Sequence, residues 1–384
     1  MARRIFYLCE IGAGLDSGMT LQVLRDYGSL SKKGWNVSIP VTYARPEEWS
    51  LFSEFVDNQC GELKAIPYDL QQRRWRASPL RLLSTLIRAL VHLRGKRGVI
   101  VIRERRHRLA AMLLRWLTGG ALVSELHEGA FPRAGNRWRR RRFQRFLDAL
   151  DGLVFTNASQ REYLRERGVI LPSRQIVLPN GVDFEHFSRA RCGQSSTVHV
   201  LTYTGQFTSW KNLPLLFSSL ARLDASFRLR IAGGKAGGDS AEYVGALAKE
   251  YGVDERVEYL GFLHPDELLA RAIDQSSVLL VPLGDNLIAR YATSPIKLIE
   301  YMATGIPVVA VNHPSVVALA GQESVHLSST DPAEFAAAIL AAVTEDEASR
   351  RRRRDNAKAL AARHDHAARA AQFDRWLSGL APQS

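Results

Sequence analysis

Residues 291–311 read YATSPIKLIEYMATGIPVVAV, a pattern that predicts a loop, a short helix, a turn and a buried strand. Ser294-Pro295 opens the helix, because the proline ring fixes φ near the helical value. The N–H that proline lacks would have no partner within the first helical turn. Gly305 ends the helix, since glycine accepts the positive φ of a helix C-terminus. The apolar run 308–311 follows as the strand.

The beginning of this helix is a candidate anion-binding site. Its first amides carry the positive end of the helix dipole, which favours a negatively charged ligand. Lys297 adds a full positive charge there, and Glu300 lies one turn further along on the same side. The alternative is an ordinary helix–strand unit whose glutamate faces solvent.

The length and composition indicate a folded protein of two domains. A chain of 384 residues is too long for one typical core, and 46% hydrophobic and 24% charged residues are ordinary values.

No run of about eighteen apolar residues is present to span a bilayer. The apolar segment 5–9 comes too early for a signal peptide, so we expect it to be the first strand of a cytoplasmic protein. Three widely separated cysteines argue against a disulfide framework and a zinc site.

The chain is strongly basic, with a formal net charge of +13 that comes largely from local arginine runs. Such runs indicate nucleic acid, an anionic membrane surface or an anionic substrate as the partner. The densest run is 137–147, RWRRRRFQRFL, which predicts a basic amphipathic helix.

Three uses of this arginine helix remain open: a solvated helix face, contact with anionic lipid, and nucleic-acid binding. We favour lipid, because aromatic side chains can enter the headgroup region while arginines pair with phosphates. Nucleic acid is not expected, since no nucleic-acid-binding motif accompanies the run. The candidates for membrane contact are Arg137, Trp138, Arg139, Arg140, Arg141, Arg142, Phe143 and Arg145.

Alternating strands and helices over the first 180 residues predict a parallel sheet covered on both faces. A loop with the spacing G-x-G-x-x-x-G begins at Gly12, which fits either a tight turn or the close approach of a ligand. His127 and Glu128 end a predicted strand, and ligands of such sheets bind beyond the carboxyl ends of the strands. A purely structural histidine is the alternative.

The stretch at 291–311 resembles the donor-site signature of the retaining glycosyltransferase family 4, in the branch that carries SPxKLxEYMAxGxPVVA. Residues 179–187 (PNGVDFEHF) resemble the end of the family's first domain, and 205–212 (GQFTSWKN) resemble its G-x(5)-KN element. The resemblance covers most of the chain, with its sharpest motifs in 175–311. It implies the GT-B fold, an α/β architecture of two Rossmann-like, doubly wound parallel-sheet domains that face a central cleft.

The resemblance also implies domain limits. Residues 1–187 would form the acceptor-binding domain and 198–362 the nucleotide-sugar-binding domain, joined by a polar linker at 188–197. A helix within 363–384 is expected to cross back to the first domain.

The resemblance assigns roles to three candidate catalytic residues. Lys211 would neutralise the donor diphosphate, Glu300 would accept hydrogen bonds from the ribose hydroxyls, and His127 would orient the reacting sugar. The implied donor-binding residues are Gly14, Gly205, Lys211, Asn212, Gly233, Gly234, Phe262, Leu263, Ser294, Pro295, Ile296, Lys297 and Glu300. The acceptor-side candidates are Gly12, Asp16 and Glu128.

The chain departs from the family pattern at two donor positions. The family's arginine after the first glycine is Gln206 here, and its first glutamate falls at Ala292. Lys297 or Arg290 is expected to replace the arginine. Because the first glutamate is missing, the sequence specifies recognition of the sugar hydroxyls less well than recognition of the nucleotide.

The implied activity is transfer of a sugar from a nucleotide-diphosphate donor to a glycan or lipid-linked acceptor, with retention at the anomeric carbon. No cofactor and no metal are expected, since the helix dipole and the lysines carry the charge and the departing phosphate oxygen takes the acceptor proton. The alternatives are a nucleotide-sugar epimerase on the same scaffold and a degenerate relative that binds membrane or nucleic acid. We expect a cytoplasmic protein with peripheral contact to the inner face of the cytoplasmic membrane.

Overall fold

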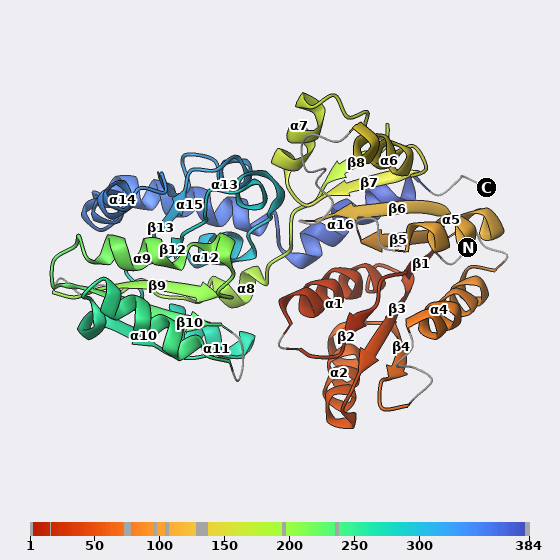
Figure 1. The fold of residues 1–384 in the computed structure, drawn as a ribbon, viewed down its shortest axis with the longest axis horizontal. Helices are drawn as coiled ribbons and strands as arrows, with labels where there is room; N and C mark the ends of the chain where they lie inside the picture. Colours follow the sequence, from red (N-terminus) through yellow and green to blue (C-terminus); the bar gives the residue numbers. More distant parts are fainter. Residues whose placement is uncertain are drawn as a thin grey trace. The chain divides into compact units, whose positions relative to one another are not determined.

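A computed structural model describes residues 3–15, 17–72, 78–94, 98–103, 107–127, 137–193, 197–234 and 238–380, with the side chains at positions 137, 139, 265 and 266 excepted. The chain forms two compact units, each with its own parallel sheet (Figure 1). Unit 1 comprises Met1–Gly181 and His366–Ser384, and unit 2 comprises Val182–Asp365. The predicted α/β architecture with two parallel-sheet domains is confirmed.

Unit 1 contains an eight-stranded sheet in which every pairing is parallel. The strand order is β2-β3-β1-β5-β6-β7-β8, with β4 added beside β3. The strands are β1 (Arg3–Tyr7), β2 (Ile11–Gly12), β3 (Trp35–Tyr43), β4 (Lys64–Asp69), β5 (Val99–Arg103), β6 (Ala121–Leu126), β7 (Gly152–Phe155) and β8 (Gln175–Val177). Strands such as β7 (GLVF) are buried along their whole length, which explains their continuous apolar sequence.

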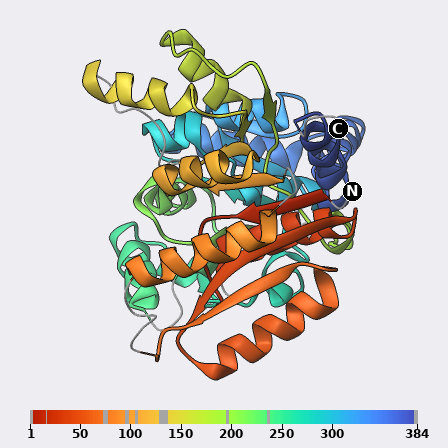
Figure 2. The same ribbon diagram turned by 90° about the vertical axis from the view of Figure 1, so that its right-hand side faces the viewer.

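The helices of unit 1 come from both ends of the chain. They are α1 (Gly18–Ser31), α2 (Pro46–Gln59), α4 (Ser78–Leu93), α5 (Arg108–Thr118), α6 (Arg137–Leu147), α7 (Ala158–Glu166) and α16 (His366–Ser378). Helix α16 ends the chain yet packs against α1 (Figure 1). Helices α4 and α5 lie side by side and cross in front of the sheet in Figure 2.

Unit 2 contains a six-stranded parallel sheet with the order β11-β10-β9-β12-β13-β14. The strands are β9 (His199–Gly205), β10 (Phe227–Gly233), β11 (Val257–Tyr259), β12 (Val278–Val281), β13 (Val308–Val311) and β14 (His326–Ser328). Its α-helices are α8 (Phe184–Phe187), α9 (Leu213–Leu220), α10 (Ser240–Glu250), α11 (Pro265–Leu268), α12 (Ile296–Thr304), α13 (Pro314–Ala320), α14 (Pro332–Thr344) and α15 (Glu347–Ala362). Short 3₁₀ and π turns are η2 (Ser209–Lys211), η3 (Asp254–Arg256), η4 (Leu269–Ile273) and η5 (Ile288–Ala292).

The stretch 291–311 folds as a helix followed by a buried strand. Gly305 adopts φ +75° and caps α12, and β13 is fully buried. The helix begins at Ile296, one residue later than expected, because Pro295 keeps an extended ψ of 101° and serves as the N-cap.

The polar segment expected to link the domains lies within unit 2 as far as it is described. Arg191 pairs with Asp274 at 2.8 Å, and the Gly193 amide donates to the Ser276 carbonyl at 2.9 Å. The first segment of unit 1 ends at Gly181, whereas the expected end of the first domain was residue 187. Unit 2 ends at Asp365, whereas the expected end of the second domain was residue 362.

Candidate functional site

Glycines end the neighbouring strands β9 and β10 of unit 2. Gly205 and Gly233 are register partners, and the amide of Gly233 donates to the Gly261 carbonyl at 2.8 Å beyond β11. The amide of Gly234 donates to the Gly205 carbonyl at 3.0 Å. The predicted donor glycines therefore meet at the carboxyl edge of the sheet, where open α/β sheets bind ligands.

The backbone at this edge has no space for side chains. Gly233 and Gly234 have φ of +136° and +89°, and a Cβ at Gly234 would lie 2.3 Å from the hydroxyl oxygen of Ser240. The positive φ and the close contact both require glycine. The resulting edge presents bare backbone.

Lys211 lies in the turn that follows β9. The turn η2 ends at Asn212, whose φ of 46° is a left-handed conformation that asparagine tolerates better than most residues. The Lys211 ammonium lies 3.9 Å from the centre of the Trp210 ring. The Trp210 carbonyl accepts the Gly284 amide at 2.9 Å, which joins this turn to the loop after β12.

Helix α12 starts at the same edge, because it runs from the loop after β12 back toward the start of β13. Lys297 in its first turn donates to a Glu300 carboxylate oxygen at 2.7 Å. Their side chains are 24% and 13% exposed, so the pair is partly desolvated. The Tyr301 hydroxyl accepts the Thr204 amide at 2.7 Å and ties the helix to the end of β9.

Other predicted donor residues lie around this edge. Phe262, directly after Gly261, keeps 38% of its surface exposed, whereas the Leu263 side chain is buried and leaves only its backbone to contact a ligand. Ser294 is buried just before α12, and Ala292 is fully buried at the end of η5. Arg290 pairs with Asp285 at 3.1 Å.

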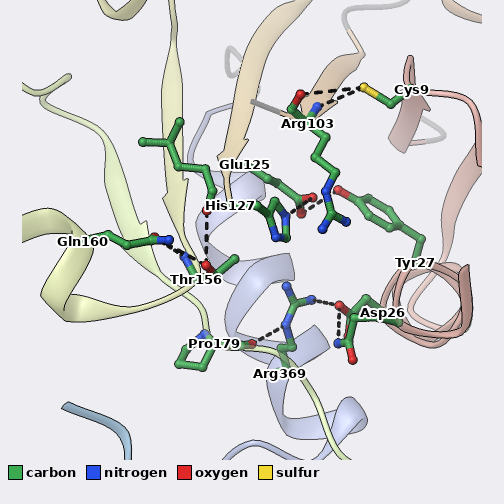
Figure 3. A network of polar contacts seen from close by, with 12 residues as sticks. Cys9, Asp26, Tyr27, Arg103, Glu125, His127, Thr156, Gln160, Pro179 and Arg369 are labelled. Carbon is green, nitrogen blue, oxygen red and sulfur yellow. Dashed lines mark hydrogen bonds and ion pairs between the residues drawn. The ribbon is translucent and has the colours of Figure 1, made fainter. Parts of the chain in front are cut away.

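In unit 1, His127 follows β6 at the carboxyl edge of the sheet and is held by a buried carboxylate. Its Nε2 lies 3.7 Å from an Oε atom of Glu125, and Tyr27 donates its hydroxyl proton to the other oxygen at 2.9 Å (Figure 3). Burial, the largest effect, raises the pKa of Glu125, but the hydrogen bond and charge of His127, together with Arg369 and Arg103, lower it below the ordinary value. Burial and the nearby Glu125 charge raise the pKa of Tyr27 well above its usual range.

Glu125 and Tyr27 were not among the sequence candidates. The spacing of Glu125 and His127 was a usable signal, because residues two apart in a strand share a face. Tyr27 had no comparable signal, since α1 reaches this carboxylate only in the folded unit.

A second buried ion pair joins α1 to α16. Arg369 lies 3.0 Å from one oxygen of Asp26, and His366 Nδ1 lies 3.1 Å from the other (Figure 3). Burial is the largest effect and raises the pKa of Asp26, yet Arg369 and His366 together lower it below the ordinary value. This pair was also missed, because its members are separated by almost the whole sequence.

The glycine loop of unit 1 leads into α1. The Gly12 carbonyl accepts the Thr20 hydroxyl at 3.0 Å, and Ser17 caps the helix. A Cβ at Gly12 would meet no atom within 4 Å, so packing within the chain does not require glycine there. The Gly14 carbonyl accepts the Ser17 amide.

Two of the acceptor-side candidates, Asp16 and Glu128, lie outside the described residues.

The arginine run forms α6 as predicted, but one expected membrane contact is wrong. Phe143 is 1% exposed and Phe146 is 4% exposed, because both pack into the core of unit 1. Trp138 is exposed and lies beneath the Arg142 guanidinium at 4.4 Å. Arg140, Arg141 and Arg145 are exposed, and the side chains of Arg137 and Arg139 lie outside the described part of the chain.

The described residues contain neither a metal-binding cluster nor a membrane-spanning helix. In that part of the chain, no three side chains of His, Cys, Asp and Glu gather in a way that could hold a metal ion. None of its helices has the length and hydropathy needed to cross a bilayer.

Family models match both halves of the chain. Residues 17–181 match the glycosyl transferase 4-like domain, and residues 198–345 match the glycosyl transferases group 1. The second match includes the glycine edge, Lys211 and α12.

The curated relatives are D-inositol 3-phosphate glycosyltransferases. The one from Geodermatophilus obscurus is 28% identical over 215 residues, which cover 51% of this chain and 46% of the relative. The one from Corynebacterium glutamicum (strain R) is 24% identical over 372 residues, covering 88% of this chain and 86% of the relative. The chain spans about half the length of the first two curated relatives that it matches.

Solved structures share the fold. Anabaena HepE in complex with UDP and glucose has a TM-score of 0.72 and 16% identity, covering 98% of this chain and all of that one. A glycosyltransferase from Rickettsia africae has a TM-score of 0.77 and 13% identity, covering 100% of this chain and 99% of that one.

Proposed function

We propose that the chain transfers a sugar from a nucleotide-diphosphate donor to an acceptor, because glycosyltransferase family models match both its N-terminal and its C-terminal half. The anomeric configuration of the sugar is retained in this proposal. The acceptor is a glycan or a lipid-linked molecule, reached from the cytoplasm at the inner face of the membrane. The family resemblance of residues 175–311 supports these finer points.

The donor binds at the carboxyl edge of the unit 2 sheet. Bare backbone at Gly205, Gly233 and Gly234 lets the nucleotide approach closely. Lys211 and Lys297 neutralise the diphosphate, whose negative charge grows as the glycosidic bond to phosphate breaks. Glu300 accepts hydrogen bonds from the two ribose hydroxyls, and the ion pair with Lys297 holds its carboxylate in place.

His127 orients the reacting sugar from unit 1. The Glu125 carboxylate, 3.7 Å from His127 Nε2, favours one orientation of the ring. The leaving phosphate oxygen takes the acceptor proton, so this mechanism uses no separate base and no metal.

The observation that carries the proposal is the meeting of three separate segments at one edge. The glycines, the Lys211 turn and the Lys297–Glu300 pair are linked there by the Gly284–Trp210 and Thr204–Tyr301 hydrogen bonds. An ordinary helix–strand unit has no reason to gather cations and a carboxylate beside bare backbone.

The first experiment measures donor binding by thermal shift with UDP-, GDP-, ADP- and dTDP-sugars, because a ligand of the folded state raises the melting temperature. UDP-glucose comes first, since a structural neighbour was solved with UDP and glucose. Lys211→Ala and Glu300→Gln should abolish the shift. Lys249→Ala and Glu250→Gln, on the exposed end of α10, are the matched controls and should keep it. A donor shift that survives in both site variants would contradict this site.

The second experiment measures turnover. We expect Lys211→Ala to lower kcat by about 10²–10³, since it removes one cation from the developing charge. Inositol phosphates belong in the acceptor panel, because the relatives are D-inositol 3-phosphate glycosyltransferases. Retention is read from the anomeric configuration of the product, and metal independence from activity in excess chelator.

The same assay separates the alternatives. Donor converted to an isomeric nucleotide sugar without any acceptor would identify an epimerase. Donor bound but never consumed, with every acceptor tried, would favour a degenerate binding protein.

A further inference from the structure

Helices α4 and α5 of unit 1 turn large apolar side chains toward solvent. Nine of the seventeen exposed large hydrophobic residues in the described part of the chain lie on these two helices. They are Leu80, Leu83, Ile87, Val91, Leu109, Met112, Leu113, Trp116 and Leu117, and we call them the α4–α5 face. Trp116 is 79% exposed, Leu109 72% and Val91 70%.

The spacing shows that these residues form one stripe on each helix. On α5 they recur at intervals of three and four residues, which places them along a single side. The fully buried residues of the two helices are fewer than the exposed ones: Thr85, Ala89 and Leu93 on α4, and Ala111 and Leu114 on α5. The larger apolar surface of both helices therefore points away from the core.

The two stripes are adjacent. Helices α4 and α5 pack against each other, and both lie on the same side of the sheet in Figure 2. A continuous apolar surface of this kind is unusual on a soluble monomer and marks a site of interaction.

The charges around this face indicate what covers it. The described residues of these helices and their immediate flanks, 78–94 and 107–118, carry five basic side chains (Arg81, Arg88, Arg94, Arg108 and Arg115) and no acidic one. Arg81 and Arg115 pair with Glu10 and Asp151 of the same unit. Arg88 and Arg94 are exposed on and just beyond α4.

A second copy of this chain is a poor occupant, because it would bring a second excess of positive charge into the interface. An anionic bilayer supplies both an apolar interior and negative phosphates, and tryptophan is well suited to the boundary between them. We propose that the α4–α5 face docks on an anionic phospholipid membrane, with its apolar side chains in the interfacial region and Arg88 and Arg94 at the headgroups. This inference does not depend on the proposed function.

The test is co-flotation of the full chain with vesicles of phosphatidylcholine, alone or with phosphatidylglycerol. We expect binding only with phosphatidylglycerol present, and weaker binding at higher salt because exposed charges are screened. The variant Ile87→Gln, Val91→Gln, Trp116→Gln should bind at least about tenfold more weakly, since buried apolar area sets interfacial affinity. The control Leu51→Gln, Leu340→Gln alters exposed leucines on α2 and α14 and should bind like the wild type.

A second measurement does not depend on the triple variant folding. Brominated acyl chains should quench the fluorescence of the wild type more than that of Trp116→Phe, since only the former has an indole at this position. Equal quenching in the two proteins would overturn the proposal.

Two other results would also overturn it. One is loss of binding only when Arg141 and Arg145 of α6 become serine, which would place the contact on α6. The other is a concentration-dependent dimer that the α4–α5 variant abolishes, in a protein that no vesicle binds.

Discussion

Gly233 ends strand β10 where the neighbouring backbone leaves no room for a side chain. A Cβ atom there would lie 1.9 Å from the carbonyl oxygen of Gly205, at a φ of +136°. That oxygen belongs to the adjacent strand and accepts the Gly234 amide, so it cannot withdraw without opening the edge of the sheet. The glycine is therefore required by the packing of the two strand ends.

We expect Gly233→Ala to lower the free energy of unfolding of unit 2 by about 2–4 kcal/mol, because a forbidden φ and a backbone clash act together. Gly245→Ala is the matched control. It lies inside α10, where a Cβ would meet no atom within 4 Å, and should stabilise the unit by about 0.5–1 kcal/mol. Denaturant unfolding followed by far-UV circular dichroism measures both, and a Gly233→Ala protein as stable as the wild type would contradict the account.

At the scale of elements, α16 is held in unit 1 by polar contacts to segments distant in the sequence. Arg369 pairs with Asp26 of α1 and donates to the Pro179 carbonyl at 2.8 Å. Near the other end of the helix, Asp374 pairs with Arg3 and accepts from the Trp35 indole. Phe373 packs against Tyr27 with ring centres 6.3 Å apart. The helix is thus part of the core of unit 1.

Asp26→Asn should destabilise unit 1 by about 3–5 kcal/mol near neutral pH, because it leaves the Arg369 charge buried without its counter-ion. Asp57→Asn, on the exposed side of α2, is the control and should change stability by less than about 0.5 kcal/mol. Tryptophan fluorescence is a suitable probe, since six of the seven tryptophans lie in unit 1.

The effect should also depend on pH. The pKa of Asp26 is lower in the folded protein than its ordinary value, so its contribution is complete above the unfolded pKa of about 4 and is lost as the pH falls through the folded pKa. The stability difference between wild type and Asp26→Asn should therefore be constant from about pH 7 to pH 5 and shrink below about pH 4. A difference that grows on acidification would show that the pair does not act as an ion pair.

At the scale of the whole molecule, the two units are built differently from the sequence. Unit 2 is one continuous segment, whereas unit 1 needs both ends of the chain. Without α16, Asp26 and Glu125 would each lose the positive charge of Arg369. The Tyr27 ring on α1 would also lose its contact with Phe373.

We accordingly expect the fragment 182–365 to fold alone with a cooperative thermal transition. The fragment 1–181 should lack such a transition, and addition of residues 366–384 in the same chain should restore it. Circular dichroism melts of the fragments, with the full chain as the reference, make the comparison. A cooperative melt of 1–181 alone would show that α16 is dispensable to unit 1.

The sequence by itself determined the α/β class, several of the elements and most of the glycine and lysine positions at the edge of the unit 2 sheet. Those predictions depend on local rules: apolar runs make buried strands, glycine ends helices, and Lys297 and Glu300 are neighbours because they share one helix. The same rules placed Lys211 after β9 and His127 after β6.

Only the tertiary structure decided which distant residues meet and which faces are covered. It brought Tyr27 and Arg369 to the carboxylates that they contact, which no local pattern encodes. It buried Phe143, counted among the membrane candidates, and exposed the stripe on α4 that periodicity alone would assign to the core. The physical reason is that periodicity shows that a helix has an apolar side, while packing decides whether that side meets the sheet or the surroundings.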